Sequence, residues 1–212
     1  MLKVGLTGGI ASGKSVVGEM LVALGARLVQ ADRIAHELML PGQPVYNEVV
    51  RHFGREILNS DGSVNRSKLA EVAFGPTSRI EELNRIVHPV VIRKQDEWME
   101  EMGRQDPNVV AIVEAALILE AGAADHFDRL IVVTCGEEQR VARFSARQKI
   151  DLTAARKEVA RRMAAQLSDE EKIKAADVVI DNSGPLEATR RQVEAVWKKL
   201  RGQAQQSSTT SL

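Results

Sequence analysis

The sequence has few of the features that mark secreted, membrane-bound or metal-centred proteins. Its 212 residues include one cysteine, Cys135, so no disulfide can form within the chain, and no cluster of Cys and His has the spacing of a metal site. No apolar run approaches the ~20 residues of a membrane-spanning helix, and no signal-type segment precedes the first apolar run. We therefore expect a soluble, cytoplasmic protein that does not act on a membrane.

A net charge is also missing. Lys and Arg together number 29, Asp and Glu also number 29, and the formal net charge is +0. The field of the whole protein therefore gives no reason to expect a nucleic acid as the partner, and any anion must bind locally. Hydrophobic residues make up 44% of the chain, which is enough for a sizeable core in one domain with insertions.

Short apolar runs predict the strands of a parallel sheet. The runs at 109–113 and 130–133 are continuously apolar, which is typical of strands buried on both faces. Shorter runs lie at 2–6, 27–30 and 178–180. Helical patterns separate the runs, so we predict a five-stranded α/β sheet with its ligands at the carboxyl ends of the strands.

The remaining sequence predicts how the chain is organised. Residues from about 33 to 104 read as helices, with breaks at Pro41-Gly42, Asp61-Gly62, Gly75-Pro76 and His88-Pro89, and predict an inserted helical subdomain. A charged helical segment follows at about 137–174, and a last helix covers about 185–200. We expect the Gln, Ser and Thr tail at 203–212 to be disordered. A single domain, 1–202, would then have its core at 1–32, 105–136 and 175–202.

The most specific motif is GGIASGKS at residues 8–15, between a predicted strand and a predicted helix. In such a phosphate-binding loop, backbone N–H groups turn toward phosphate oxygens and the helix N-terminus adds a positive dipole end. Lys14 would reach the β and γ phosphates of ATP or GTP, and the Ser15 hydroxyl would hold Mg²⁺. A glycine-rich turn beside a surface lysine is the alternative. The predicted nucleotide-binding residues here are Gly8, Gly9, Ala11, Ser12, Gly13, Lys14, Ser15 and Val16.

Two acidic residues follow predicted strands at the same edge of the sheet. Asp32 is a candidate general base for an attacking hydroxyl, or the N-cap of a helix that starts near Ile34. Glu114 ends the third strand, where it could organise Mg²⁺ through water, or it is a solvated strand end.

Arg140, Arg143 and Arg147 share one face of the charged helical segment, at positions i, i+3 and i+7. On a mobile lid, guanidinium groups can stabilise charge on a transferred phosphoryl group. The alternative is a solvated face paired with nearby glutamates. Because a phosphate loop is present, we favour the lid interpretation for Arg140 and Arg147. His88 by itself reads as a capping or packing histidine.

Together these segments resemble the dephospho-CoA kinase family, from about residue 2 to residue 200. The segments that carry the resemblance are GLTGGI and SGKS within 5–15, Ala31-Asp32 with Ile34-Ala35, Pro41-Gly42, Leu83-Asn84 with His88-Pro89, Glu114 with LILE at 117–120, Gln139-Arg140 with Arg147, Gln166 with Glu171-Lys172, Ala176-Asp177, Val179-Ile180, and Asn182 with Gly184. Only the phosphate loop is specific by itself, so the order and spacing of the set carry the resemblance.

The resemblance implies a P-loop NTPase fold, a three-layer α/β/α sandwich with a helical coenzyme A subdomain at 33–104 and a lid at 137–174. It implies ATP-dependent phosphorylation of the ribose 3′-hydroxyl of dephospho-coenzyme A, with Mg²⁺. We expect a monomer or weak homo-oligomer. Asp32 would activate the hydroxyl. The implied site also has Arg140 and Arg147 on the lid side of the phosphates, Asn182 and Gly184 near adenine, and His88, Pro89 and Leu117 at the acceptor.

The sequence departs from the family pattern at three positions. Gln30 replaces the first acid of the usual Asp-Ala-Asp, which we expect to be dispensable. Ala11 stands where glycine is common, and it should be tolerated if its φ is negative. Ala116 replaces a usual proline, which loosens the chain without removing a chemical group.

Two other functions are compatible with a phosphate loop. One is a P-loop kinase that acts on a nucleoside or a nucleoside monophosphate. The other is a GTP-dependent switch, which the sequence disfavours because Asn182-Ser183-Gly184 does not match the guanine-binding Asn-Lys-x-Asp.

Overall fold

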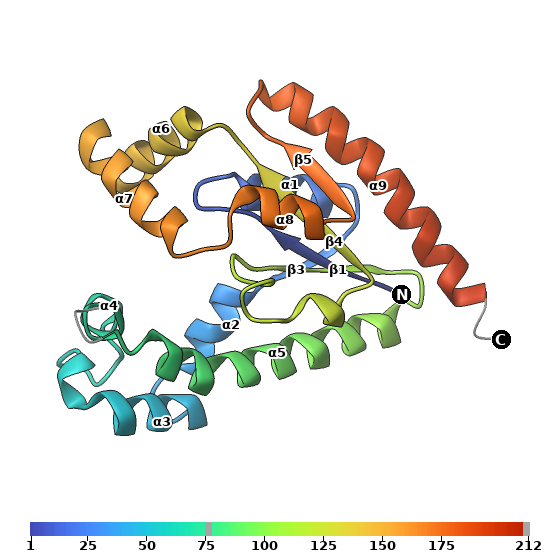
Figure 1. Ribbon diagram of the computed structural model, residues 1–212. Helices are drawn as coiled ribbons and strands as arrows, with labels where there is room; N and C mark the ends of the chain where they lie inside the picture. Colours follow the sequence, from blue (N-terminus) through green and yellow to red (C-terminus); the bar gives the residue numbers. More distant parts are fainter. Residues whose placement is uncertain (75–77, 210–212) are drawn as a thin grey trace. The chain divides into compact units, whose positions relative to one another are not determined.

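The structure, a computed structural model, describes residues 1–74 and 78–209 (Figure 1). The chain divides into two compact units. The first comprises 1–29 and 98–212, and the second comprises 30–97. No helix in the described ranges is both long and apolar enough to cross a bilayer.

The first unit is built on a five-stranded sheet with the order β2-β3-β1-β4-β5. Figure 1 labels β1, β3, β4 and β5 of this sheet. Its strands are β1 (Leu2–Thr7), β2 (Arg27–Gln30), β3 (Val110–Glu114), β4 (Arg129–Thr134) and β5 (Val178–Asp181). β1 pairs in parallel with β3 and β4, and β4 pairs in parallel with β5. The predicted strands and the predicted α/β class are confirmed.

Helices cover both faces of this sheet, and the period of two along β3 shows how. Val110 and Ile112 point to a core shared with α1 (Lys14–Ala23) and α9 (Leu186–Thr209). Ala111 and Val113 point the other way, to a cluster with Met99. Every residue of β3 is buried, which explains why this strand reads as a continuous apolar run.

The end of α1 is set by a glycine. Gly25 has a φ of +116°, in the left-handed region that other residues avoid. Its N–H donates to the carbonyl of Val22 at 2.9 Å, and the N–H of Ala26 donates to that of Leu21 at 3.1 Å. This is a Schellman motif, and it turns the chain sharply toward β2.

The charged segment at 137–174 forms three helices of the first unit. They are α6 (Glu137–Gln148), α7 (Leu152–Ala164) and α8 (Asp169–Ala175). Apolar side chains of α6 and α7 pack against each other in a small cluster that also contacts Ile10 and Ala11. Asp151 caps α7, and Ser168 forms a capping box with Glu171 at the start of α8.

The second unit is helical, as its sequence predicts. Its elements are α2 (Ala31–Leu38), α3 (Pro44–Phe53), the 3-10 turn η1 (Arg55–Ile57), α4 (Arg66–Phe74) and the first part of α5 (Ile80–Gln105). A second 3-10 turn, η2 (Ala124–His126), belongs to the first unit. Turns occur at the predicted breaks Pro41-Gly42 and Asp61-Gly62, whereas Gly75-Pro76 lies outside the described residues.

The predicted break at His88-Pro89 is wrong, because α5 continues through Pro89. Proline lacks the N–H that would donate to the carbonyl four residues earlier, so one helical bond is missing there. Val87 and Val91 are both buried, at 8% and 7% exposed. Packing on both sides of the proline therefore offsets the lost bond.

The predicted disorder at 203–212 is wrong for residues 203–209, which continue helix α9; residues 210–212 lie outside the described part. Ala204 is 0% exposed and belongs to the main core. Gln203 accepts a hydrogen bond from Arg129 at 3.2 Å. The helix is already formed when it reaches these residues, so each added residue needs no new nucleus.

Candidate active site

The phosphate loop connects β1 to α1 and uses its glycines for distinct steric reasons. Gly8 has a φ of +151° and Gly13 a φ of +95°. A Cβ on Gly8 would overlap the carbonyl of Val133, and one on Gly13 would overlap the amide of Asn182. The strand, the loop and the helix occur as predicted, and Lys14 is half-buried.

Lys14 and Ser15 begin α1, and both side chains turn back toward the loop and the sheet. Lys14 Nζ donates to the carbonyl of Gly8 at 2.9 Å and to that of Gly9 at 3.4 Å. Ser15 Oγ donates to Glu114 Oε1 at 2.7 Å. Glu114 is 8% exposed, so its interpretation as a solvated strand end is wrong. The ammonium and the carboxylate are thus both held at the carboxyl edge of the sheet.

Ala11 does not meet the condition that its φ be negative. Its φ is +53°, in a region that costs a residue with a Cβ roughly 1–2 kcal/mol. Two contacts favour this conformation. The methyl group lies beside the cluster around Phe144, and the carbonyl accepts the Cys135 S–H at 3.7 Å. Burial raises the pKa of the Cys135 thiol, which keeps it a neutral donor.

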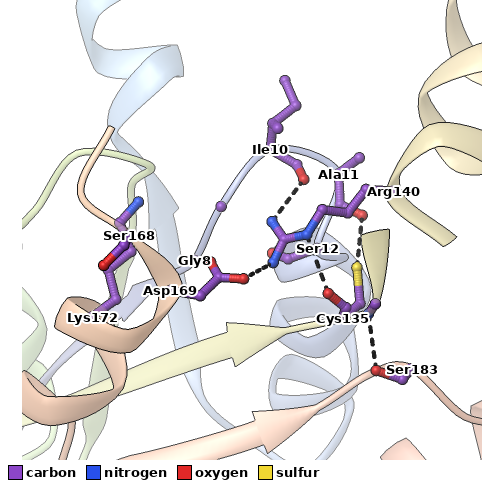
Figure 2. A network of polar contacts seen from close by, with 12 residues as sticks. Gly8, Ile10, Ala11, Ser12, Cys135, Arg140, Ser168, Asp169, Lys172 and Ser183 are labelled. Carbon is purple, nitrogen blue, oxygen red and sulfur yellow. Dashed lines mark hydrogen bonds and ion pairs between the residues drawn. The ribbon is translucent and has the colours of Figure 1, made fainter. Parts of the chain in front are cut away.

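Arg140 lies against the loop rather than in solvent (Figure 2). It is 1% exposed, and its guanidinium donates to the carbonyl of Cys135 at 3.1 Å and to that of Ile10 at 3.2 Å. It also forms an ion pair with Asp169. The alternative of a solvated charged face is therefore wrong for Arg140.

The two other arginines on this helix face have different positions. Arg143 donates to the carbonyl of Ser12 at 3.2 Å and to that of Asn182 at 2.8 Å. Arg147 is exposed, and its guanidinium lies 5.6 Å from the ring centroid of Phe144. The structure thus brings Arg140 and Arg143 to the loop. Arg143 was not among the predicted site residues, although its i+3 spacing from Arg140 was the available signal.

The arginines of α7 do fit the solvated alternative. Arg156 pairs with Glu138 at 2.8 Å, and both side chains are about half or more exposed, at 49% and 76%. Arg161 and Arg162 donate hydrogen bonds to Glu158 and lower the pKa of that carboxyl to about 2. These are surface pairs within or between α6 and α7, of the kind that contributes little to stability.

Asn182 anchors the loop from the end of β5. It is 3% exposed, its amide donates to the carbonyl of Ser12 at 2.8 Å, and its oxygen accepts from Thr189 at 2.9 Å. Gly184 lies nearby in the turn before α9, exposed, and a Cβ there would only touch Ala188 at 3.8 Å. Thr189 is a further residue that sequence reasoning missed, since nothing local marks it.

Asp32 lies in the second unit, in the first turn of α2. The helix begins at Ala31 and its N-cap residue is Gln30, so the alternative of Asp32 as N-cap is wrong. Its side chain is exposed. Among the residues that the structure describes, no hydrogen-bond or ion-pair partner of this carboxylate is found.

The predicted acceptor residues lie in both units. His88 and Pro89 belong to α5 in the second unit, and burial lowers the pKa of His88. Leu117 lies in the turn after β3 in the first unit, half-buried. At its neighbour Ala116 the carbonyl accepts from Thr7 Oγ1 at 3.3 Å, so this turn is fixed without the proline that the family pattern has.

The comparisons with known proteins decide the family. A family model described as dephospho-CoA kinase matches residues 2–188. The chain belongs to the dephospho-CoA kinase family. Dephospho-CoA kinase of Leifsonia xyli subsp. xyli is 40% identical over 202 residues, which are 95% of this chain and 100% of the relative. That of Geobacter metallireducens is 42% identical over 199 residues, 94% and 96% of the two chains.

Solved structures agree with this membership. TT1252 from Thermus thermophilus has a TM-score of 0.76 and 32% identity, covering 94% of this chain and 97% of its own. Dephospho-CoA kinase from Campylobacter jejuni has a TM-score of 0.68 and 26% identity over the same shares, 94% and 97%. Shikimate kinase from Acinetobacter baumannii, with a TM-score of 0.53 at 14% identity, shares the fold alone. The predicted resemblance is confirmed, together with the P-loop kinase fold.

Proposed function

We propose that this chain transfers the γ-phosphoryl group of ATP to the ribose 3′-hydroxyl of dephospho-coenzyme A, which gives coenzyme A and ADP. Its membership in the dephospho-CoA kinase family, over 2–188, is the observation that carries the proposal. The phosphate loop supports it. A bound triphosphate needs hydrogen-bond donors that neutralise the phosphate charge before a hydroxyl can attack it.

The donor half of the reaction belongs to the first unit. Backbone N–H groups of the loop and the ammonium of Lys14 would bind the β and γ phosphates. Ser15 and Glu114, whose oxygens lie 2.7 Å apart, suit Mg²⁺, which keeps most of its ligands as water and substrate phosphates. No group of three metal-binding side chains is found in the described ranges, which is consistent with this mode of binding. When bound, Mg²⁺ would neutralise phosphate charge.

The acceptor half depends on Asp32. Its exposed carboxylate can accept the proton of the 3′-hydroxyl as that oxygen attacks phosphorus, so that a better nucleophile forms. His88 and Pro89, in the second unit, would contact the acceptor, and Leu117, in the first unit, is a further proposed acceptor residue. Burial lowers the pKa of His88 and so favours its neutral form. A neutral side chain suits an uncharged part of the substrate.

The remaining predicted residues would serve the nucleotide. Arg140, which lies against the loop, would stabilise charge on the transferred group, and Arg147 would join it from the lid. Asn182 and Gly184 would lie near adenine. A monomer or weak homo-oligomer is the proposed state.

One assay tests the proposal. ADP release from ATP and Mg²⁺ would be measured with dephospho-coenzyme A, adenosine or AMP as the acceptor, and the product would be weighed by mass spectrometry. We expect one phosphate to be added to dephospho-coenzyme A alone. Turnover with adenosine or AMP would favour the nucleoside kinase alternative, and a preference for GTP without any acceptor would favour a switch.

A further inference from the structure

The guanidinium of Arg140 is oriented by acceptors on three segments of the chain (Figure 2). Two are main-chain carbonyls, that of Cys135 after β4 and that of Ile10 in the phosphate loop. The third is the carboxylate of Asp169, the first residue of α8. Because Asp169 is the charged acceptor among the three, its hydrogen bond is the strongest constraint on the guanidinium.

The position of α8 depends in turn on the ion pair of a buried lysine. Lys172 is 0% exposed, and its Nζ lies 3.1 Å from Glu120 Oε1, in a side chain that is 18% exposed. The same Glu120 oxygen accepts the N–H of Leu167 at 3.0 Å, and Gln166 Oε1 lies 3.4 Å from the Lys172 ammonium. One carboxylate therefore ties both α8 and the segment that leads into it to the turn after β3.

Stability alone does not explain the ion pair of Lys172 and Glu120. Burying an ammonium is costly, and an apolar pair of similar volume often gives equal stability. α8 has only 7 residues, which is too short for a helix to hold its own position. Its N-terminus is already closed by the capping box of Ser168 and Glu171. What the pair of Lys172 and Glu120 adds is a fixed register of α8 on the sheet, and Asp169 depends on this register.

We infer that Lys172 and Glu120 are positioning residues for phosphoryl transfer: they fix α8, α8 places Asp169, and Asp169 orients Arg140 on the phosphate loop. The inference rests on the proposed function in that Arg140 stabilises the transferred group. The absence of a side chain at Gly9 is consistent with this positioning of Arg140. A Cβ at this position would overlap the Arg140 guanidinium and lie 3.3 Å from Asp169 Oδ1, so the loop leaves room for the pair.

Two variants test the pathway at different points. Asp169→Asn removes the charge but keeps the size of a side chain that is one-third exposed, at 32%. The double variant Lys172→Met/Glu120→Gln removes the ion pair without leaving an unpaired charge, so it should fold. For both we expect kcat to fall about tenfold to a hundredfold, the loss typical of a misplaced catalytic group, while KM for dephospho-coenzyme A stays unchanged. Lys174→Met, an exposed lysine on the same helix, is the matched control and should keep the wild-type kcat.

Combination with Arg140→Lys separates positioning from a structural role. If Asp169 acts through Arg140, then Asp169→Asn adds no further loss of kcat in the Arg140→Lys background, because coupled residues are non-additive. Additive losses would overturn the inference. So would a wild-type kcat in both Asp169→Asn and the double variant, or an equal loss in Lys174→Met.

Wild-type turnover distinguishes this inference from the proposed function. If the wild-type protein does not phosphorylate dephospho-coenzyme A, the proposed function fails. The affinity for ATP, measured by calorimetry on the same variants, then provides the test. If Asp169→Asn and Arg140→Lys each weaken ATP binding, and the two losses do not add in the combined variant, the pathway is supported. An unchanged affinity for ATP in Asp169→Asn overturns it.

Discussion

Ala11 is the residue at which the phosphate loop departs most from backbone preference. Its positive φ of +53° is stabilised by what surrounds it, namely the cluster of α6 and α7. A residue in this conformation should respond to substitution in the opposite order from a helical residue, since glycine is favoured here and a β-branched side chain is not.

We therefore predict that Ala11→Gly leaves the free energy of unfolding unchanged to within about 1 kcal/mol, because relief of strain offsets the greater entropy of the unfolded chain. Ala11→Val should lower it by about 2 kcal/mol. Urea denaturation measures both. At Ala23, an exposed helical residue of α1, glycine should instead be the worse of the two substitutions. The same order at both positions would contradict the prediction.

His88 should make stability depend on pH. Burial lowers its pKa in the folded state, whereas the unfolded chain has a value near 6.5. The unfolded state therefore binds the proton more readily, and the stability that neutral His88 contributes is present above about pH 6.5 and is lost as the pH falls below it.

The melting temperature should accordingly fall less between pH 7.5 and pH 5.5 in His88→Gln than in the wild-type protein, by roughly a few degrees at most for a half-buried group. His36→Gln, an exposed histidine of α2 in the same unit, serves as the control for general effects of histidine removal. If the two variants behave alike, burial of His88 has no part in the pH dependence.

Among the elements, α9 shows what a polar composition conceals. Its buried residues Val193, Trp197, Leu200 and Ala204 recur at helical spacing, so the core-facing stripe does extend beyond residue 202. Composition alone predicted disorder there, because it counts apolar residues without their period. At 203–209 the helical period of the apolar stripe, continued by Ala204, is therefore a better predictor of structure than the polar composition of the segment.

We predict that truncation after Gly202 lowers the free energy of unfolding by about 1–2 kcal/mol, because it exposes the core next to Ala204 and removes one hydrogen-bond acceptor of Arg129. A disordered tail would instead contribute nothing to the free energy of unfolding. Truncation after Gln206 keeps both contacts and should leave the unfolding midpoint unchanged. Equal midpoints for the two truncated proteins would show that the end of α9 contributes nothing.

The local elements of the site could be predicted from sequence, and the distant contacts could not. The loop at 8–15 is recognisable because its strand, glycines and helix are adjacent in the chain. The contact between Asn182 and Ser12 joins residues 170 positions apart, and that between Arg143 and Ser12 joins residues 131 apart. No local pattern reports such pairs. For the same reason the sequence does not predict Asp169 as a site residue, and only the structure shows it beside Arg140.

At the scale of the whole molecule, the two halves of the proposed reaction belong to different units. The phosphate loop lies in the first unit, whereas Asp32 lies in the second. A change at Asp32 should therefore affect acceptor activation and leave the nucleotide contacts intact.

We predict that Asp32→Asn lowers kcat by about 10²–10⁴-fold, the contribution expected of a general base, with little change in the affinity for ATP. ADP release and calorimetric titration with ATP measure the two quantities. Glu37→Gln removes an acid from the same helix, where Glu37 pairs with Arg33 at the surface, and should retain full activity. Loss of ATP binding in Asp32→Asn would instead assign this residue to the metal or to the structure.

The central place of β1 in the sheet also has a consequence for synthesis. β1 leaves the ribosome well before its partners, which are β3 at 110–114 and β4 at 129–134. At typical rates of translation it must wait roughly ten seconds for them. During that interval an apolar strand has no native partner. The nascent chain of this protein should therefore depend on shielding by a chaperone to a greater extent than the nascent chain of a protein whose first strand pairs with its second strand.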